Sequence, residues 1–454
     1  MDAVDDPFVI EKLGPASVLS PMKLGTSTGD LLADFVPDET KIVASILLAE
    51  VSSHTQIGSP PPALEKAGPR QYLYFDPAKL TVGIVTCGGL CPGLNDVIRG
   101  LVMTLHHGYG VSNIVGFKYG FEGLDPQYGH QPVHLVPETV KDISSSGGTL
   151  LGTSRGTHDP SVMVDVLLSN NIGLFFIIGG DGSIRGALAI HQVIKERGLK
   201  IGIVAVPKTI DNDIPMVDRT FGFQTAVELA LETLRSAYYE AQSASNGIGL
   251  VKLMGRHSGH IAAHAALAMH NANLVLIPEI PFDLEGENGL FSYLERRLEK
   301  NKSTVIVVAE GAGQEHMHQM DTTDASGNRR LSDIGLFLKE MINKRFGEDY
   351  RISLKYIDPS YIIRSHPANA NDSIFCAHLA QMAAHAGISG RTGMSVGRSH
   401  GKFTHIPLER LVETRSTIDP EGDLWRSVLE STGQPFLMTK RHSCDGKAMP
   451  EREK

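Results

Sequence analysis

The sequence predicts an α/β protein with two lobes and largely parallel sheets. The chain has 454 residues, which exceeds one ordinary domain, so two lobes with hydrophobic cores are expected. From Leu80 onward, short apolar runs alternate with longer amphipathic stretches, as they do in βαβ units. The apolar runs are continuous rather than alternating in polarity, which is typical of parallel strands buried on both faces.

The individual elements follow from this rhythm. The predicted buried strands are LTVGIVT, GLFFIIG, IGIVAV, GIGLVKL, NLVLIP and STVIVVA. The predicted helices between them cover residues 95–107, 184–197 and 223–243. In the last helix, the residues expected to face the core recur at helical spacing and are Ala226, Leu229, Ala230 and Leu234.

The chain changes character near residue 80. Residues 1–79 are expected to form an extension on the core, in which residues 32–51 can form a helix and GSPPPALEKAGPRQ is a Pro-rich connector. The part of the chain that follows Gly401 contains FTHIPLERLVE and is expected to pack on the lobes. That part contains no motif that indicates a chemical function.

Composition and charge exclude several classes of protein. A hydrophobic content of 41% with 20% charged residues describes a soluble globular protein. The net charge of −9 argues against non-specific nucleic-acid binding, which usually requires an excess of Lys and Arg. No apolar run approaches the roughly 18 residues of a spanning helix, and the acidic start MDAVDDPF lacks the features of a presequence. We expect a cytoplasmic protein that binds neither membranes nor nucleic acid.

The cysteines agree with that expectation. The four cysteines form neither a disulfide framework nor a zinc pattern, and they are Cys87, Cys91, Cys376 and Cys444. This suits a reducing compartment. The spacing of Cys87 and Cys91 is not that of a redox pair, so both are interpreted as buried thiols in a turn.

Each predicted strand is followed at once by a Gly-rich or polar motif. These motifs are CGGLCPGLN, GGDGS, PKTIDND, MGRHSG, PEIPF and AEGAGQ. Ligands of open α/β sheets bind outside the carboxyl ends of the strands, so the motifs are expected to converge.

The motif GGDGS, from Gly179 to Ser183, has the composition of a phosphate-binding turn. Small residues let backbone amides approach a phosphate, and the N-terminus of the following helix favours an anion. Asp181 can hold Mg²⁺ through its hard oxygens, or it can serve as the N-cap of that helix. The Walker A pattern does not occur, which makes a P-loop fold unexpected.

Two further Gly-rich segments have the same character. Gly88 and Gly89 follow a predicted strand and indicate a second phosphate-facing turn. Arg155 lies in the loop GGTLLGTSRGT, and an arginine there can bridge phosphate oxygens during phosphoryl transfer. The flanking glycines favour that interpretation over a solvated surface arginine.

The segment VPKTIDNDIP has the residues that a kinase acting on an alcohol requires. Such an enzyme needs a carboxylate near the hydroxyl, metal-bound phosphates and cations for the developing charge. In an extended segment Thr209, Asp211 and Asp213 would point to one side and Asn212 to the other. An Asx-rich turn that caps the next element is the structural alternative, and the segment alone does not decide between them.

Taken in this order, GGDGS, PKTIDND, LMGR and KYIDPSYIIR resemble the phosphofructokinase family over about residues 80–364. TCGGLCPGLN together with PKTIDND and YIDPSYIIR is most similar to the long ATP-dependent members of plants and protists, which also have an N-terminal extension. The resemblance implies phosphorylation of fructose 6-phosphate at the 1-hydroxyl with Mg-ATP, the committed step of glycolysis. It also implies two Rossmann-like lobes with the active site in the cleft between them, and a homotetramer under allosteric control.

The resemblance implies a division of the chain as well. Residues 1–79 are the N-terminal extension and residues 80–222 the ATP- and Mg²⁺-binding lobe, completed by about 365–415. Residues 223–364 form the sugar-phosphate-binding lobe. Residues 416–454 form a C-terminal tail.

The family's donor-site residues carry over onto this chain position by position. Asp181 matches the Mg²⁺ site, and Asp213 matches a carboxylate near the metal. The residues that match nucleotide and ATP-phosphate contacts are Gly88, Gly89, Arg155, Gly156, Gly180, Gly182 and Ser183.

The acceptor-site residues carry over in the same way. Asp211 matches the general base that takes the proton of the 1-hydroxyl, with Thr209 and Ile210 completing the substrate segment. Arg155 and Arg256 join Asp211 as the implied catalytic residues. The sugar-phosphate contacts are implied for Met254, Gly255 and Arg256, the sugar hydroxyls for Glu310, and the 6-phosphate for Lys355, Tyr361 and Arg364. The structural alternatives are core packing for Met254, a strand-end ion pair for Glu310, a core aromatic for Tyr361 and a basic surface patch for Lys355 and Arg364.

Departures from the family pattern limit what the resemblance implies. Gly247 stands where short bacterial enzymes place a cross-subunit arginine, so one ligand of the 6-phosphate must come from elsewhere. Tyr361 and Lys355 replace a histidine and an arginine, and both can still donate to phosphate. Arg99 matches an arginine of the bacterial effector site but Met103 does not match the next, which makes control by those effectors doubtful.

The phosphoryl donor depends on two positions. Pyrophosphate-dependent members typically carry aspartate at position 182 and lysine at 208, whereas this chain has Gly182 and Lys208. Glycine leaves room for the α-phosphate of ATP, which favours ATP over the pyrophosphate alternative. A catalytically silent regulatory subunit is a further alternative, although Asp181 and Asp211 are both present.

Overall fold

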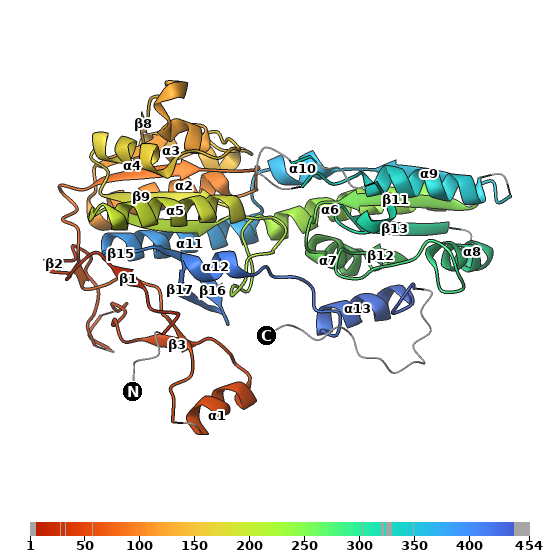
Figure 1. The fold of residues 1–454 in the computed structure, drawn as a ribbon, viewed down its shortest axis with the longest axis horizontal. Coiled ribbons are helices and arrows are strands. Elements are labelled where there is room, and N and C mark those ends of the chain that lie inside the picture. The colour runs from red at the N-terminus through yellow and green to blue at the C-terminus, as the bar shows by residue number, and fades with distance from the viewer. Residues whose placement is uncertain are drawn as a thin grey trace. The chain divides into compact units, whose positions relative to one another are not determined.

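The computed structural model describes residues 6–439 except 28, 32, 57, 302, 319–321, 324–328 and 348. The chain divides into two compact units (Figure 1). Unit 1 comprises Met1–Ala226, Thr322–Arg329 and Tyr361–Ser416, and unit 2 comprises Val227–Asp321, Arg330–Ser360 and Thr417–Lys454. No helix within the described residues is long and apolar enough to cross a membrane.

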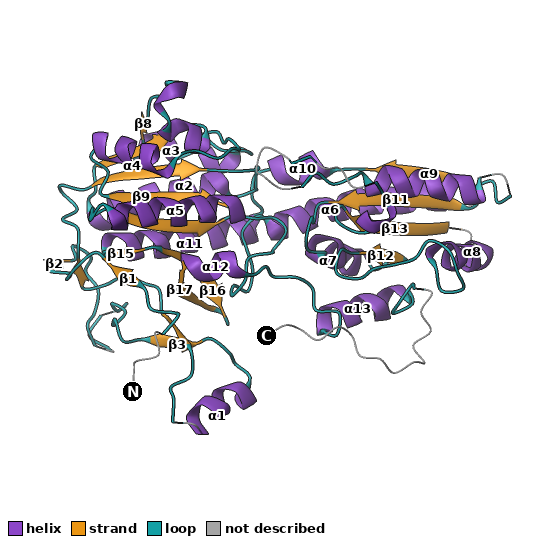
Figure 2. Cartoon of the chain, in the orientation of Figure 1, coloured by secondary structure: helices purple, strands orange, loops and turns teal. Residues whose placement is uncertain are grey.

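Unit 1 is built on a seven-stranded sheet (Figure 2). Its strands, in spatial order, are β17 (Lys402–Pro407), β16 (Met394–Ser399), β10 (Gly202–Pro207), β9 (Leu174–Gly179), β6 (Thr81–Thr86), β7 (Asn113–Phe117) and β8 (Val133–His134). The five central strands are parallel, and only the edge strands β17 and β8 are antiparallel to their neighbours. Every residue of β6, β9 and β10 is buried, as their continuous apolar sequences predict.

Helices pack on this sheet as two groups. The longer helices of unit 1 are α2 (Leu94–Met103), α4 (Pro160–Ser169), α5 (Asp181–Glu196) and α11 (Ala370–Ile388). The short helix α12 (Leu408–Glu413) directly follows β17. Helix α2 packs on α11, whereas α5 packs on α4 and α12. Phe175 and Ile177 of β9 share one buried cluster with Ile184 and Ile190 of α5, so the apolar stripe of α5 faces the sheet.

The register of the central strands places three loops at one edge of the sheet. Ile178 of β9 is paired with Thr86 of β6 and with Val206 of β10. The three strands therefore end level with one another. The loops that begin after β6, after β9 and after β10 leave from the same edge of the sheet, which is the arrangement that open α/β sheets use to bind ligands.

Unit 2 is built on a smaller, wholly parallel sheet. Its order is β12 (Leu274–Leu276), β13 (Ser303–Ala309), β11 (Gly247–Leu253) and β14 (Ser353–Ile357). The helices assigned to it are α7 (His260–Met269), α8 (Leu290–Asn301), α9 (Ile334–Phe346), α13 (Asp423–Thr432) and α6 (Phe223–Gln242) from Val227 onward. Both sheets confirm the predicted fold class.

Close packing of α6 on β11 explains two glycines of that strand. A Cβ atom on Gly247 would overlap the carbonyl oxygen of Ala241, and one on Gly249 would lie 2.7 Å from that of Ala237. Such short contacts with helix backbone cannot be relieved by rotating a side chain. The backbone at position 247 therefore leaves no room for the arginine that the sequence comparison considered there.

The predicted elements agree with the structure with two exceptions. All six predicted strands and the three predicted helices are present, although the helix predicted over 95–107 changes at Thr104 to a π-helical turn that ends at Gly108. The helix considered for residues 32–51 is wrong, because β3 (Lys41–Val43) pairs with β4 (Ala63–Glu65) and α1 covers only Leu48–Gln56. Pro37 cannot lie inside a helix without removing a hydrogen bond, which favours the strand.

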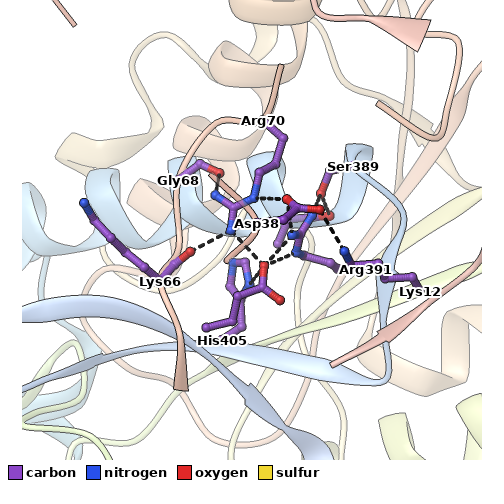
Figure 3. Close-up of polar contacts among 10 residues, drawn as sticks. Lys12, Asp38, Lys66, Gly68, Arg70, Ser389, Arg391 and His405 are labelled. Atoms are coloured by element: carbon purple, nitrogen blue, oxygen red, sulfur yellow. Dashed lines mark hydrogen bonds and ion pairs between the residues drawn. The ribbon is translucent and has the colours of Figure 1, made fainter. Parts of the chain in front are cut away.

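The N-terminal extension is attached to the rest of unit 1 by a cluster of charges that is buried except for Asp38 (Figure 3). Glu65 Oε1 accepts from Arg70 Nη2 at 2.8 Å and from Arg391 Nε at 2.6 Å. Asp38 Oδ1 lies 2.9 Å from both Arg70 Nε and Arg391 Nη2. Burial would raise the pKa of Glu65, but His405 and Arg391 together hold that pKa well below its ordinary value. A carboxylate that is ionised and paired therefore joins the extension to strands near the C-terminus.

Two buried histidines in this region make stability depend on pH. Burial lowers the pKa of both His385 and His405 to about 4. The unfolded chain, in which a histidine has a pKa of about 6.5, therefore binds more protons than the folded chain between pH 6.5 and 4. Stability falls as the pH decreases through this window, by about 2 kcal/mol per histidine between pH 7 and pH 5.

We expect His405→Gln to make the urea midpoint less sensitive to pH between 7 and 5, whatever the absolute stability of the variant. The measurement is urea denaturation at a series of pH values. The exposed His107 provides the control, since His107→Gln should leave the pH dependence of the wild type unchanged. An unaltered slope in His405→Gln would show that His405 is not held neutral in the folded chain.

Candidate active site

The turn after β6 lies among cations from three other segments. A Cβ on Gly89 would lie 3.3 Å from Arg155 Nη2 and 3.6 Å from Arg364 Nη1, and one on Gly88 would lie 3.6 Å from Lys208 Nζ. Gly88 has a φ of 82°, which favours glycine, and its N–H donates to Ser154 O at 3.1 Å. The structure thus brings the predicted phosphate-binding glycines together with three positive charges.

Lys208 is the most buried of these cations. Its Nζ donates to Gly89 O at 2.5 Å, so the lysine joins the loop after β10 to the turn after β6. Burial lowers its pKa, the nearby Cys91 and Cys87 raise it, and the positive Arg155 and Arg364 lower it further. A polyphosphate bound here would relieve the repulsion among the three cations.

Arg364 reaches this position because the backbone at Gly147 lies very close to the backbone at Ser365. Arg364 lies in the short helix α10 (Ser360–Ser365), with its guanidinium carbon 4.7 Å from the centre of the Tyr361 ring. A Cβ on Gly147 would overlap Ser365 O, so only glycine permits this approach. Tyr361 is 75% exposed, which shows that the core-aromatic alternative for it is wrong.

The turn after β9 opens a long helix. Gly180 is the N-cap of α5, and Asp181 is the first helical residue. The alternative in which Asp181 caps the helix is therefore wrong, and its carboxylate is instead paired with Arg415 at 2.8 Å and with Arg185 at 3.2 Å. The N–H groups of the first turn of this 16-residue helix can receive an anion. A Cβ on Gly182 would have no atom within 4 Å, so the space beside it is open.

The loop PKTIDND is a turn and not an extended segment. Asn212 has a φ of 54°, in the left-handed region, and its Oδ1 accepts from Thr220 N at 2.9 Å. Thr209 Oγ1 accepts from Asp211 N at 3.0 Å. The expectation that alternation alone places Asp211 and Asp213 on one side is wrong, because it required extended backbone. Thr209 and Asn212 hold the turn in which both carboxylates lie.

The cysteines beside this region are structural. Cys87 and Cys91 are buried, and Cys91 Sγ donates to Phe221 O at 3.2 Å. Burial raises the pKa of Cys87 to about 12 and that of Cys91 further. The predicted interpretation as buried thiols is confirmed for this pair, while Cys444 lies outside the described residues.

In unit 2 the MGR turn and Glu310 lie side by side. Leu253 and Ala309, the last residues of β11 and β13, are paired, so the two motifs leave neighbouring strands at the same level. Gly255 has a φ of 126°, and its carbonyl accepts from Gly311 N at 3.1 Å. Met254, Gly255, Arg256 and Glu310 are therefore brought together, as the convergence of strand ends predicts.

Lys355 is placed differently from the other predicted 6-phosphate residues. It is exposed in the middle of the edge strand β14, where it is paired with Gly249. Tyr361 and Arg364 belong to unit 1, whereas Lys355 belongs to unit 2. The three residues do not form a cluster within either unit.

Sequence reasoning missed Arg185 and Arg415, the two partners of Asp181. Arg185 lies one turn further along α5, where an i, i+4 ion pair could have been anticipated. Arg415 is 234 residues away from Asp181 in sequence and belongs to no motif. No signal in the sequence would have identified it.

The chemistry of the available donors fits Mg²⁺. Among the described residues no group of three or more His, Cys, Asp or Glu side chains forms a closed metal site. Mg²⁺ usually keeps several waters and binds through one or two carboxylates together with substrate phosphates. Asp181, in the first turn of α5, together with Asp213 in the loop after β10, is a predicted donor set of that kind.

Fold and site together define an α/β protein in which three cations gather at the carboxyl ends of the central strands of its larger sheet. A model of the family described as "Phosphofructokinase" matches residues 81–387. The chain belongs to the phosphofructokinase family.

Curated relatives match most of the chain. An ATP-dependent 6-phosphofructokinase of Borreliella burgdorferi is 46% identical over 439 residues, covering 95% of this chain and 97% of its own. ATP-dependent 6-phosphofructokinase 1 of Arabidopsis thaliana is 48% identical and covers 82% of this chain and 79% of its own. An ATP-dependent 6-phosphofructokinase of Trypanosoma brucei brucei is 46% identical and covers 84% of this chain and 79% of its own.

Solved structures share the fold at lower identity. A pyrophosphate-dependent phosphofructokinase from Nitrosospira multiformis has a TM-score of 0.64 at 20% identity and covers 77% of this chain and 90% of its own. A phosphofructokinase from Saccharomyces cerevisiae has a TM-score of 0.60 at 24% identity and covers 78% of this chain and 48% of its own. These likenesses concern the fold alone.

Proposed function

We propose that this chain is an ATP-dependent 6-phosphofructokinase, which transfers the γ-phosphoryl group of ATP to the 1-hydroxyl of fructose 6-phosphate and forms fructose 1,6-bisphosphate. The observation that carries the proposal is the cluster of Arg155, Lys208 and Arg364 around Gly88 and Gly89, next to the loop that contains Asp211. The names of the relatives from Borreliella burgdorferi and Arabidopsis thaliana support ATP as the donor. A cytoplasmic homotetramer is part of the same proposal.

The donor is held mainly by unit 1. The proposed contacts of the nucleotide and its phosphates are Gly88, Gly89, Arg155, Gly156, Gly180, Gly182 and Ser183. When bound on Asp181 and Asp213, Mg²⁺ would neutralise charge on the donor phosphates. Arg155 and Lys208 add fixed positive charge where the phosphoryl group is transferred, and such preorganised charge stabilises the transition state without rearrangement.

The acceptor is activated by Asp211. Its carboxylate accepts the proton of the 1-hydroxyl, with Thr209 and Ile210 beside the sugar. Arg256, with Met254 and Gly255, is proposed to bind the sugar phosphate, and Glu310 to accept hydrogen bonds from sugar hydroxyls. Lys355, Tyr361 and Arg364 are proposed for the 6-phosphate, because each can donate to an anion.

We expect Asp211→Ser to lower kcat by about 10² to 10⁴, the range that a general base contributes, while the affinity for fructose 6-phosphate changes little. Serine can still accept and donate hydrogen bonds in the turn, but it cannot take the proton at neutral pH. Steady-state kinetics and equilibrium binding of fructose 6-phosphate measure the two quantities. Near-normal turnover by the variant would rule out Asp211 as the base.

Gly182 is the proposed determinant of the donor. Because a Cβ there meets no protein atom within 4 Å, a side chain at this position fits the folded chain and acts on the ligand instead. A carboxylate would crowd and repel the α-phosphate of ATP, whereas pyrophosphate has no third phosphate to repel.

We expect Gly182→Asp to lower kcat/KM for ATP by at least about tenfold, since one tenfold step corresponds to about 1.4 kcal/mol of repulsion. Gly182→Asn, which has the same size without the charge, separates steric from electrostatic effects and should lose less. The measurement is kcat/KM for ATP in both variants, with the thermal midpoint as a folding control. Unchanged ATP turnover in Gly182→Asp would contradict the proposed role of position 182.

A further inference from the structure

Residues 408–416, here called the α12 strap, cross the start of α5 without belonging to any recognised motif. They lie beyond residues 81–387, the part of the chain that the family model matches. Helix α12 packs on α5, and Arg185 Nη2 of α5 donates to Val412 O at 3.1 Å. The strap is therefore fixed to the helix whose first residue is Asp181.

Two adjacent residues of the strap contact the two segments that contain the proposed metal carboxylates, which are the first turn of α5 and the loop after β10. Arg415 Nη2 donates to Asp181 Oδ2 at 2.8 Å. The next residue, Ser416, donates its backbone N–H to Asp213 O at 2.9 Å. Because Ser416 fixes the backbone, the Arg415 side chain is directed at Asp181 by a constraint that is independent of their ion pair.

Charge balance gives the Arg415 side chain a role beyond packing. Arg185 Nε lies 3.2 Å from Asp181 Oδ1, so each carboxylate oxygen of Asp181 has a guanidinium beside it. Counted together, these two arginines and the two proposed metal carboxylates, Asp181 and Asp213, have a formal charge of zero. A divalent cation alone would leave this group of charges with an excess of two positive charges, and a polyphosphate that arrives with the metal would offset that excess.

A metal bound to Asp181 would bring its phosphate ligands into the neighbourhood of Arg415. Ligand oxygens lie 2.0–2.1 Å from Mg²⁺, so two oxygens on one metal are at most about 4.2 Å apart. If Mg²⁺ were held by Asp181 together with a donor phosphate, a phosphate oxygen on the side of Arg415 would lie near the guanidinium that contacts this carboxylate. Arginine has five N–H donors and is suited to phosphate. At 31% exposure, its side chain is also accessible to a ligand.

We propose that Arg415 is a further donor-binding residue, which pairs with Asp181 while the nucleotide is absent and with a donor phosphate when the metal–nucleotide complex binds. The proposal rests on the proposed function, in which Asp181 holds the metal. It has a specific consequence, since Arg415 competes with a metal ion that arrives alone and assists one that arrives with a polyphosphate. A residue that only attaches the strap to α5 would affect both forms of the metal in the same direction.

The test measures binding and does not depend on turnover. Mn²⁺ affinity of the full chain is determined by electron paramagnetic resonance, with and without the β,γ-imido analogue of ATP. In Arg415→Gln we expect Mn²⁺ alone to bind about two- to fivefold more tightly, because a partly exposed ion pair no longer competes. We expect the Mn²⁺–analogue complex to bind about tenfold more weakly, because a charge-assisted hydrogen bond to phosphate is lost.

Two further variants serve as controls. Arg415→Lys keeps the charge and should stay close to the wild type for Mn²⁺ alone while recovering part of the affinity for the complex. Arg410→Gln removes an arginine from the same strap, where it pairs with Glu413, and should leave both affinities unchanged. Tighter binding of Mn²⁺ alone together with weaker binding of the complex would then be due to position 415 and not to the strap as a whole.

The remaining outcomes separate this proposal from the proposed function. If both affinities fall together in Arg415→Gln, or if neither changes, while Asp181→Asn weakens binding of the complex, the role of Arg415 is overturned and the donor site stands. If Asp181→Asn leaves binding of the complex unchanged, Asp181 does not hold the metal. In that case the proposed donor site and the Arg415 proposal both fail.

Discussion

The parallel pairing of β9 with β6 and β10 is the constraint on which the proposed phosphate site depends. Because Ile178 is level with both Thr86 and Val206, three loops start from one edge. Lys208 then reaches Gly89, and Arg155 and Arg364 complete the group of cations. A shift of one residue in either pairing would separate these groups and turn each side chain of the shifted strand toward the opposite layer of helices.

Much of the fold could be predicted from the sequence, because the central strands are buried on both faces and have continuous apolar sequences. The convergence of the strand-end motifs was also predictable, since it follows from parallel pairing. The error over residues 32–51 arose because composition alone does not reveal a partner strand, here β4. The same-side argument for Asp211 and Asp213 failed because Asn212 adopts left-handed backbone. Arg415 could not be found because its contact with Asp181 exists only in the folded chain.

Glycine has a structural role here that motif comparison alone does not explain. Position 247 has room only for glycine, because α6 packs directly on β11. Gly147 allows α10 to bring Arg364 beside Gly89. These positions restrict sequence through backbone contact and not through ligand contact. Gly182 is different, since the space beside it is open within the folded chain. Because no protein atom restricts position 182, a ligand is left as the proposed restriction there, and this is the basis of its proposed role in the choice of donor.

The account is tested most directly by the turnover of fructose 6-phosphate with Mg²⁺ and either ATP or pyrophosphate. Formation of fructose 1,6-bisphosphate by the full chain is followed in a coupled assay, with the two donors compared at equal concentration. The account predicts turnover with ATP and little or none with pyrophosphate. Faster turnover with pyrophosphate would contradict the assignment of the donor, and no turnover with either donor by folded protein would indicate a catalytically silent subunit.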